Sequence, residues 1–363
     1  MPAQLNTRLL VFLALLFTSV SSFQANEAVK FAEGIPVPWG MTQLPDGRFL
    51  VTERSGNLYL VDATGNKTEV TGLPEISVNG QGGLLDVIQH PEYARNGWLY
   101  FSYSSKDGEG EGENTTIMRA KLKGNELVEQ QRIYKASPNV ATRYHFGSRM
   151  AFDNEGYLYF SIGDRGQRDK LPQDLNMDGG KIYRVHDDGR IPKDNPFVKG
   201  PKPAAYSYGH RNPQGMAKDP RTGKIWTHEH GPRGGDEVNI IEPGKNYGWP
   251  VISYGINYNG TSFTDLTEKE GMEQPVYYWD PSIAPSGMVF VTGDKYPEWQ
   301  GKLLIGSLKF NYLVLCHLEG DKIIKTEVVQ KDIGRVRNLI QAADGYIYVA
   351  TDNGGLYKLE PGQ

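Results

Sequence analysis

Polar and cationic side chains recur just before short apolar segments of this chain. Each stands in a Gly-containing cluster that opens such a segment, and the candidates are Gln81, His145, Arg211 with Asn212, and Arg335 with Arg337. One imidazole, three guanidiniums and two amides make a poor core but suit a polyanionic ligand. The imidazole could also act as a base, because its ordinary pKa of about 6.5 lets it accept a proton at neutral pH. This chemistry requires a fold that brings four separate segments to one place.

A repeated turn predicts such a fold. A glycine followed one residue later by apolar residues occurs six times, at Gly47, Gly97, Gly156, Gly223, Gly301 and Gly345. A four-stranded propeller blade takes roughly 40–50 residues. The shortest intervals between these glycines match one blade, and the longer intervals indicate insertions.

Further strands follow several of these repeats, after Gly56, Gly180 and Gly355. Strand, turn and strand repeated six times cannot form one flat sheet without exposed edges, whereas radial repetition leaves only short ones. We therefore predict an all-β fold, a six-bladed β-propeller of four-stranded antiparallel blades, with residues 29–31 adding a strand to the last blade. An open β-sandwich or two β domains would be the alternative, but no Pro- or Ser-rich linker interrupts the repeats.

The residue five places after each repeat glycine is small in five of the six copies. The small residues are Thr52, Ser102, Ser161, Gly306 and Ala350, and the exception is His228. We expect crowding at this position, where a strand approaches a neighbouring blade or the axis.

The N-terminus has the layout of a secretory signal. Arg8 precedes an apolar run over residues 9–17, and a Ser-rich stretch and Ala25 follow. The run is shorter than the roughly 20 residues of a membrane span. We predict a signal peptide over 1–25, a single propeller domain over 26–363, and a periplasmic or secreted protein. A buried core helix or an uncleaved anchor is the alternative.

Composition excludes several classes of partner. The formal net charge is -4 and basic runs are absent, which argues against nucleic acid and anionic membrane surfaces. No other run is apolar enough to span a membrane. The single cysteine, Cys316, rules out an internal disulfide and lies in an apolar stretch, so we expect it to be a buried small hydrophobe.

Six motifs give a more specific indication, and they stand in the order HFGSRM, SIGDRG, YGHRNPQG, HEHGPRGGDEVN, NYGWP and GRVRN. Together they resemble the soluble PQQ-dependent aldose sugar dehydrogenases, the family that includes soluble quinoprotein glucose dehydrogenase, over roughly residues 35–360. The resemblance implies a six-bladed propeller, PQQ and Ca²⁺ as cofactors, and oxidation of an aldose at C1 to a lactone. One cysteine cannot form a CxxCH haem attachment, so electrons must leave to an external acceptor.

The resemblance also implies roles for individual residues. His145 matches the base that takes the proton from the C1 hydroxyl, and Asp164 matches the carboxylate that orients it. Arg211 would stabilise charge on the reduced cofactor. The positions that match cofactor contacts are Gln81, Arg211, Asn212, Lys309, Arg335 and Arg337.

Metal binding is implied at two places. The carbonyl groups of Gly231 and Pro232 match the calcium site that clamps PQQ, while Glu237 and Tyr247 match a second, structural calcium site. An alternative makes His228 and His230 zinc ligands, but a third ligand at a defined spacing is missing. The chain contains no GxGxxG fingerprint, so NAD is not supported.

Two other functions stay open. A calcium-dependent lactonase or esterase on a six-bladed propeller would need carboxylates around a metal at the centre of the channel. A non-catalytic binding propeller would not require the imidazole and the guanidiniums to converge. Residues 255–274 contain no recognisable long substrate loop, so we expect a shallow rim that accepts many aldoses.

Overall fold

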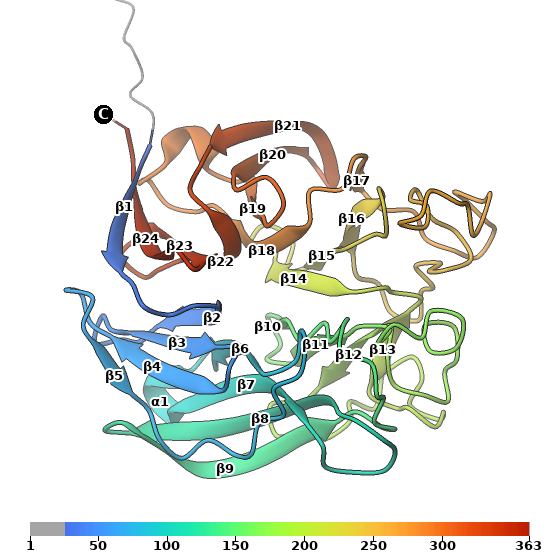
Figure 1. Cartoon of the computed structure of the whole chain (residues 1–363), viewed down its shortest axis with the longest axis horizontal. Coiled ribbons are helices and arrows are strands. Elements are labelled where there is room, and N and C mark those ends of the chain that lie inside the picture. The colour runs from blue at the N-terminus through green and yellow to red at the C-terminus, as the bar shows by residue number, and fades with distance from the viewer. Residues whose placement is uncertain (1–25, 363) are drawn as a thin grey trace, which may run out of the picture.

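The computed structural model describes residues 26–362, and these form a ring of six four-stranded antiparallel sheets around a central axis (Figure 1). The predicted six-bladed propeller is confirmed. In the first five blades the strands follow one another in sequence order across each sheet. The predicted signal peptide, residues 1–25, lies outside the described residues.

The first three blades fill the lower half of the ring in Figure 1. Their elements are β2 (Pro38–Gln43), β3 (Phe49–Glu53), β4 (Asn57–Val61) and β5 (Lys67–Glu69); β6 (Leu84–Gln89), the short helix α1 (Tyr93–Asn96), β7 (Trp98–Ser105), β8 (Asn114–Lys123) and β9 (Glu126–Lys135); and β10 (Met150–Phe152), β11 (Leu158–Ile162), β12 (Lys181–Val185) and β13 (Ala205–Tyr208).

The remaining blades complete the ring. Their elements are β14 (Pro213–Lys218), β15 (Ile225–Glu229), β16 (Asp236–Ile240) and β17 (Tyr277–Trp279); β18 (Pro285–Phe290), the 3₁₀ turn η1 (Pro297–Trp299), β19 (Leu303–Ser307), β20 (Leu313–Glu319) and β21 (Lys322–Gln330); and β22 (Arg335–Gln341), β23 (Ile347–Asp352), β24 (Gly355–Glu360) and β1 (Glu27–Ala32). Within residues 26–362, no helix is long and apolar enough to cross a membrane.

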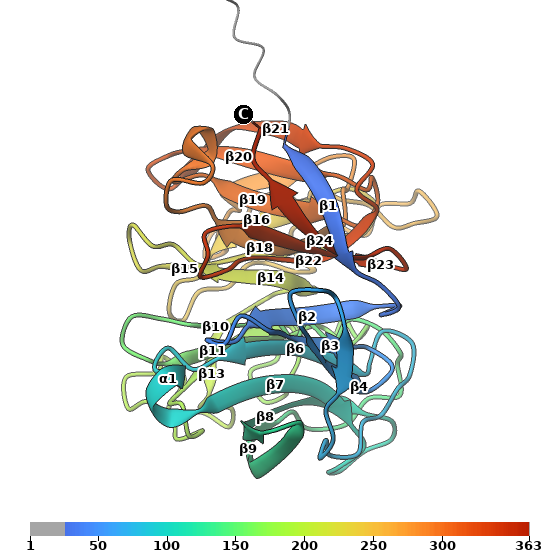
Figure 2. The ribbon, with the colours of Figure 1, turned by 90° about the vertical axis from the view of Figure 1, so that its left-hand side faces the viewer.

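The ring closes through a strand from the other end of the chain. Strand β1 pairs antiparallel with β24, with Glu27 opposite Glu360 and Val29 opposite Lys358. Figure 2 shows β1 in blue beside the red strands of the sixth blade. The extra strand predicted at residues 29–31 is confirmed, and the last blade therefore contains both ends of the described chain.

Six buried apolar clusters hold the blades together, one at each junction between neighbouring blades. Leu58 and Phe101, for example, join the first blade to the second. Full burial of such a side chain contributes roughly 1.5–3 kcal/mol. Cys316 is buried in the cluster between the fourth and fifth blades, as a small hydrophobe, which confirms the expectation.

The small residues after the repeat glycines lie where one blade meets the next. The Ser102 hydroxyl donates to the carbonyl of Ser148 at 2.7 Å, and the Ser161 hydroxyl donates to the carbonyl of Pro213 at 3.2 Å. Each bond runs from the second strand of a blade to the first segment of the following blade. The expected crowding is therefore present, and the short side chain tightens the junction.

The exception, His228, fits because its neighbour is a glycine. The His228 Nε2 lies 3.4 Å from the Gly287 carbonyl in the next blade. A Cβ atom on Gly215 would come within 2.0 Å of that nitrogen. The missing side chain at Gly215 thus makes room for the imidazole.

Candidate active site

The segments that open the innermost strands meet at one end of the propeller. The Gln81 side-chain carbonyl accepts a hydrogen bond from the His145 backbone N–H at 2.8 Å. The Asn212 side-chain carbonyl accepts one from the Gly147 backbone N–H at 3.2 Å. These contacts connect the segments before β6, β10 and β14, so the structure brings Gln81, His145 and Asn212 together from three blades.

His145 and Asp164 form a hydrogen-bonded pair. The His145 Nδ1 lies 2.7 Å from Asp164 Oδ1, which also accepts the Gly166 backbone N–H at 2.7 Å. The Trp249 indole N–H donates to Asp164 Oδ2 at 2.8 Å. The Asp164 side chain is only 1% exposed, so its two oxygens depend on these protein groups for hydrogen bonds.

The protonation states of this pair suit base catalysis. Burial lowers the pKa of His145, the Arg211 charge lowers it further, and the hydrogen bond to Asp164 opposes both. Burial alone would raise the pKa of Asp164. The hydrogen bond and charge of His145, the Arg211 charge and the Gly166 N–H together outweigh burial, and the pKa falls below its usual value. At neutral pH the pair is therefore a neutral imidazole beside a carboxylate, which can accept one proton.

Arg211 is held beside this pair at three points. Its backbone N–H donates to Glu229 at 2.5 Å, and its Nη1 donates to the His230 carbonyl at 2.8 Å. Its guanidinium also lies 5.3 Å from the centre of the Trp249 ring. The guanidinium is therefore fixed in place, and its charge acts on the His145 imidazole, whose pKa it lowers.

Two of the other predicted cations, Arg335 and Arg337, lie on the sixth blade around one carboxylate. Lys309 lies on the fifth blade, where its Nζ donates to the Ser282 carbonyl at 3.0 Å. Arg337 Nη2 lies 2.7 Å from Asp352 Oδ2, and Arg335 Nε lies 3.1 Å from the same oxygen. Arg335 also donates to the carbonyl of Leu308, the residue before Lys309, at 2.9 Å. The two arginines share the carboxylate of Asp352, a residue outside the motifs of the sequence.

A small cavity beside Arg211 is lined by the four residues predicted to bind metal, Gly231, Pro232, Glu237 and Tyr247. The sequence divides them between two sites, whereas the structure brings all four to one lining. The Tyr247 hydroxyl donates to the Ile240 carbonyl and accepts the Glu242 N–H at 3.0 Å. Because this hydroxyl is engaged, Tyr247 would offer a metal its main-chain carbonyl.

The donor set around this cavity fits a hard cation. Among the described residues, the Glu237 carboxylate accepts one hydrogen bond, from the Asn239 amide at 3.2 Å. Burial and the nearby charge of Glu229 raise the pKa of Glu237 to about 8. Within residues 26–362, the Asn239 side-chain oxygen is buried without a hydrogen-bond partner. Calcium binds carboxylate, amide and main-chain carbonyl oxygens, so it would stabilise this arrangement.

Asp236 holds the loop that carries Gly231 and Pro232. Its two oxygens accept the backbone N–H groups of Gly231 at 2.9 Å and Ala284 at 2.7 Å. Burial raises the pKa of Asp236 to about 6. Asp236 and Glu229 both lie in the motif HEHGPRGGDEVN, but the motif does not reveal that they anchor Gly231 and Arg211.

The family model for glucose/sorbosone dehydrogenases matches residues 35–358. The chain belongs to this family. The aldose sugar dehydrogenase of Escherichia coli (strain K12) is 41% identical over 335 residues, which cover 89% of this chain and 90% of that protein. The resemblance noted in the sequence is thus confirmed, and membership of this family makes the chain an oxidoreductase.

Two solved structures of this family are similar over nearly the whole fold. The apo-form of the Escherichia coli enzyme has a TM-score of 0.87 and 38% identity, and the match covers 93% of this chain and 99% of that one. The PQQ-bound aldose sugar dehydrogenase of Streptomyces coelicolor has a TM-score of 0.76 and 30% identity, with 93% and 98% covered.

The two histidines considered as zinc ligands face main-chain carbonyls in this family member. His228 Nε2 contacts Gly287, and His230 Nε2 lies 2.7 Å from the carbonyl oxygen of Pro285. Across residues 26–362, no group of three or more His, Cys, Asp or Glu side chains is placed to hold a metal. Both imidazoles instead help to join the fourth blade to the fifth.

The segment from residue 255 to residue 274 contributes side chains close to the candidate site. The connection between β16 and β17 reaches the site, where Phe263 packs edge-on against Trp249 with 5.3 Å between ring centres. The Asn257 side-chain carbonyl accepts a hydrogen bond from Arg168 at 2.8 Å. Phe263 therefore lies against the indole that donates to Asp164, while the shallow rim stays a prediction.

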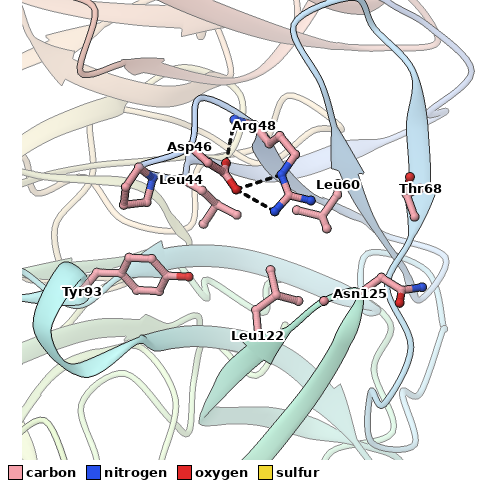
Figure 3. A pocket seen from close by; sticks show the side chains of 10 residues that line it. Leu44, Asp46, Arg48, Leu60, Thr68, Tyr93, Leu122 and Asn125 are labelled. Atoms are coloured by element: carbon pink, nitrogen blue, oxygen red, sulfur yellow. Dashed lines mark hydrogen bonds and ion pairs between the residues drawn. The ribbon is translucent and has the colours of Figure 1, made fainter.

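A separate groove of about 650 Å³ opens at the other end of the propeller, between the first two blades (Figure 3). It is lined by Leu44, Leu60, Leu122 and Tyr93, and by the Asp46–Arg48 ion pair. None of the predicted site residues lines this groove. The residues with catalytic potential belong to the opposite end.

Proposed function

We propose that this glucose/sorbosone dehydrogenase family member oxidises aldoses at C1 to lactones, with PQQ and Ca²⁺ as cofactors. The observation that carries the proposal is the pair of His145 and Asp164, with 2.7 Å between Nδ1 and Oδ1, beside the fixed guanidinium of Arg211. The PQQ-bound relative from Streptomyces coelicolor supports the choice of cofactor.

His145 would act as the base through Nε2. Asp164 occupies Nδ1, and within residues 26–362 the Nε2 atom makes no hydrogen bond. This nitrogen can take the proton from the C1 hydroxyl while Asp164 stabilises the imidazolium that results. A positioned base typically contributes about 10²–10⁴-fold to the rate.

The cofactor contacts carried over from the family would divide by chemistry. Arg335, Arg337 and Lys309 are cations suited to carboxylates, and Gln81 and Asn212 would fix the ring through their amides. Gly231 and Pro232 would hold the calcium through carbonyl oxygens, with Glu237 and Tyr247 as further oxygen donors. When bound, PQQ would supply the hydride acceptor and calcium the Lewis acid that activates it.

We further propose that the protein is exported and passes its electrons to an external acceptor. The charged, apolar and small-residue layout of the first 25 residues supports export. The single cysteine supports an external acceptor, since it cannot form a CxxCH haem site.

Reconstitution tests the proposed activity directly. The purified protein is incubated with PQQ and Ca²⁺, several aldoses are added in turn, and reduction of an artificial acceptor dye is followed. We expect dye reduction that requires sugar, PQQ and Ca²⁺ together. Absence of sugar-dependent reduction in every combination would overturn the proposal, and hydrolysis of lactones without PQQ would favour the lactonase alternative.

A further inference from the structure

Trp249 stands behind the His145–Asp164 pair. Its side chain comes from the connection between β16 and β17, whereas Asp164 follows β11 and His145 precedes β10. The indole N–H donates to Asp164 Oδ2 at 2.8 Å, while His145 and Gly166 use Oδ1. The base and its carboxylate thus lie on loops, and this bond ties Asp164 to a third segment.

We propose that Trp249 is a positioning residue for His145, because its indole N–H fixes the carboxylate that in turn fixes the imidazole. Without this donor, Asp164 could rotate about its side-chain bonds and lose its alignment with Nδ1. The inference rests on the proposed role of His145 as the base.

Trp249 is itself held firmly enough for this role. Its backbone N–H donates to the Gly209 carbonyl at 2.9 Å. Phe263 packs against its ring edge-on, with 5.3 Å between centres and 70° between planes, and the Arg211 guanidinium lies 5.3 Å from its ring centre. Trp249 is 7% exposed. A rigid, buried donor is what an orienting hydrogen bond requires, because its geometry then survives thermal motion.

The bond also sets the charge that His145 experiences. A hydrogen bond to a carboxylate stabilises its charge and weakens its pull on a neighbouring imidazolium. Loss of the indole N–H would therefore raise the pKa of His145 and leave Oδ2 buried without that donor. The wild type and a variant without the indole N–H share the other titratable groups near His145, which are Tyr144, Arg165, Arg211 and His230.

Trp249→Phe removes the N–H and keeps an aromatic ring. We expect kcat at pH 7 to fall about 10–100-fold, the usual range for a lost hydrogen bond to a charged group. We also expect the acidic limb of the kcat profile to move to higher pH, while KM changes less. A purely structural role would not move the pH profile.

Trp226→Phe is the matched control. Trp226 is fully buried in the fourth blade, and its Nε1 has no hydrogen-bond partner in the described protein. This variant loses a buried indole without touching Asp164, so its pH profile should match that of the wild type. If Trp249→Phe fails to fold, Trp249→Gln takes its place: it loses the ring but keeps an N–H, and we expect its pH profile to stay near that of the wild type.

An NMR titration of the full mature chain, without cofactor, gives a readout independent of turnover. The His145 ring signal, assigned with His145→Gln, should titrate at higher pH in Trp249→Phe than in the wild type. The inference is overturned if the His145 titration is unchanged in Trp249→Phe. It is also overturned if the kcat of this variant stays within twofold of the wild type and the acidic limb of its profile does not move. A wild type without sugar-dependent activity would overturn the proposed function alone, and the titration would still decide the coupling.

Discussion

Arg149 and Asp86 form a buried ion pair between the third and second blades, with 2.9 Å between Nη1 and Oδ1. The Arg149 Nε also donates to the Gln214 carbonyl of the fourth blade at 3.0 Å, and its guanidinium lies 4.1 Å from the Trp39 ring of the first. One side chain therefore connects four blades beneath the candidate site.

Removal of this cation should destabilise the ring. Arg149→Met leaves the Asp86 carboxylate, 3% exposed, without its counter-charge, which typically costs about 3–5 kcal/mol. Chemical denaturation would measure the loss. Arg48→Met is the control, because the Arg48–Asp46 pair is exposed on both sides, and such pairs contribute roughly 0–1 kcal/mol. Equal losses in the two variants would contradict the prediction.

The rate should depend on pH through His145. Its pKa lies below the usual value because of burial, and the neutral form is the one that accepts a proton. The rate should therefore fall as the pH drops below about 6.5 and should be close to its maximum above that pH. Asp164 stays ionised throughout this range, because its pKa is lowered. A profile of kcat/KM against pH, measured with excess PQQ and Ca²⁺, checks the sign.

His145→Gln should lower kcat by about 10²–10⁴-fold while the affinity for PQQ changes little, because it removes the base and no cation. Absorbance titration with PQQ would measure that affinity. His317→Gln serves as the control, since His317 pairs with Glu327 on the outer part of the fifth blade. A His145→Gln variant with near-normal turnover would remove His145 from the role of base.

The sequence was informative where a pattern repeats and weak where a contact is unique. Six glycine turns predict the ring, because each blade needs the same tight turn between its first two strands. His145 and Arg211 stand out because their motifs open strands that meet at one end. Trp249 bonds to Asp164 across 85 positions of the chain, and no local spacing encodes such a contact.

The same reason explains the missed carboxylates. Asp352 lies opposite Arg335 on the adjacent strand. Only the pairing of β22 with β23 shows that its carboxylate contacts both Arg335 and Arg337. Glu229 reads as part of an HEH sequence, yet its function is to hold the backbone of Arg211. Nor does the sequence show that the four residues predicted to bind metal line one cavity, because they come from separate loops; the number of metal sites stays a prediction.

The two arginines of the sixth blade should differ in their effect on PQQ. The Arg337 side chain is 10% exposed and that of Arg335 is 51% exposed. Solvent screens an exposed cation, so Arg335→Met should weaken PQQ binding by no more than about fivefold. Arg337→Met should weaken it by about 10–100-fold. Equilibrium titration with PQQ at fixed Ca²⁺ compares them, and a larger effect at Arg335 would contradict this assignment.

Calcium binding should become stronger as the pH rises toward 8. The pKa of Glu237 is raised to about 8 by burial and by the charge of Glu229, so at pH 6 the carboxyl is protonated and a cation must displace the proton. The apparent affinity should therefore rise by up to about tenfold per pH unit below 8 and level off above it. Calorimetric titration of the metal-free protein at pH 6, 7 and 8 measures this slope.

Glu237→Gln should weaken calcium binding and remove most of its pH dependence, because the displaced proton is then absent. Glu327→Gln, a change at an exposed carboxylate on β21, should leave both the affinity and its pH dependence unchanged.

In the metal-free wild type, Glu237 makes the folding stability depend on pH in the opposite direction to the calcium affinity. The folded state holds the Glu237 proton between about 4.5 and 8 while the unfolded chain releases it, so this contribution to stability is present at acidic pH and is lost as the pH rises through 8. Calcium should therefore stabilise the protein more at pH 8, where the metal-free form has lost this contribution, than at pH 6. Thermal unfolding with and without Ca²⁺ at pH 6 and 8 measures this difference.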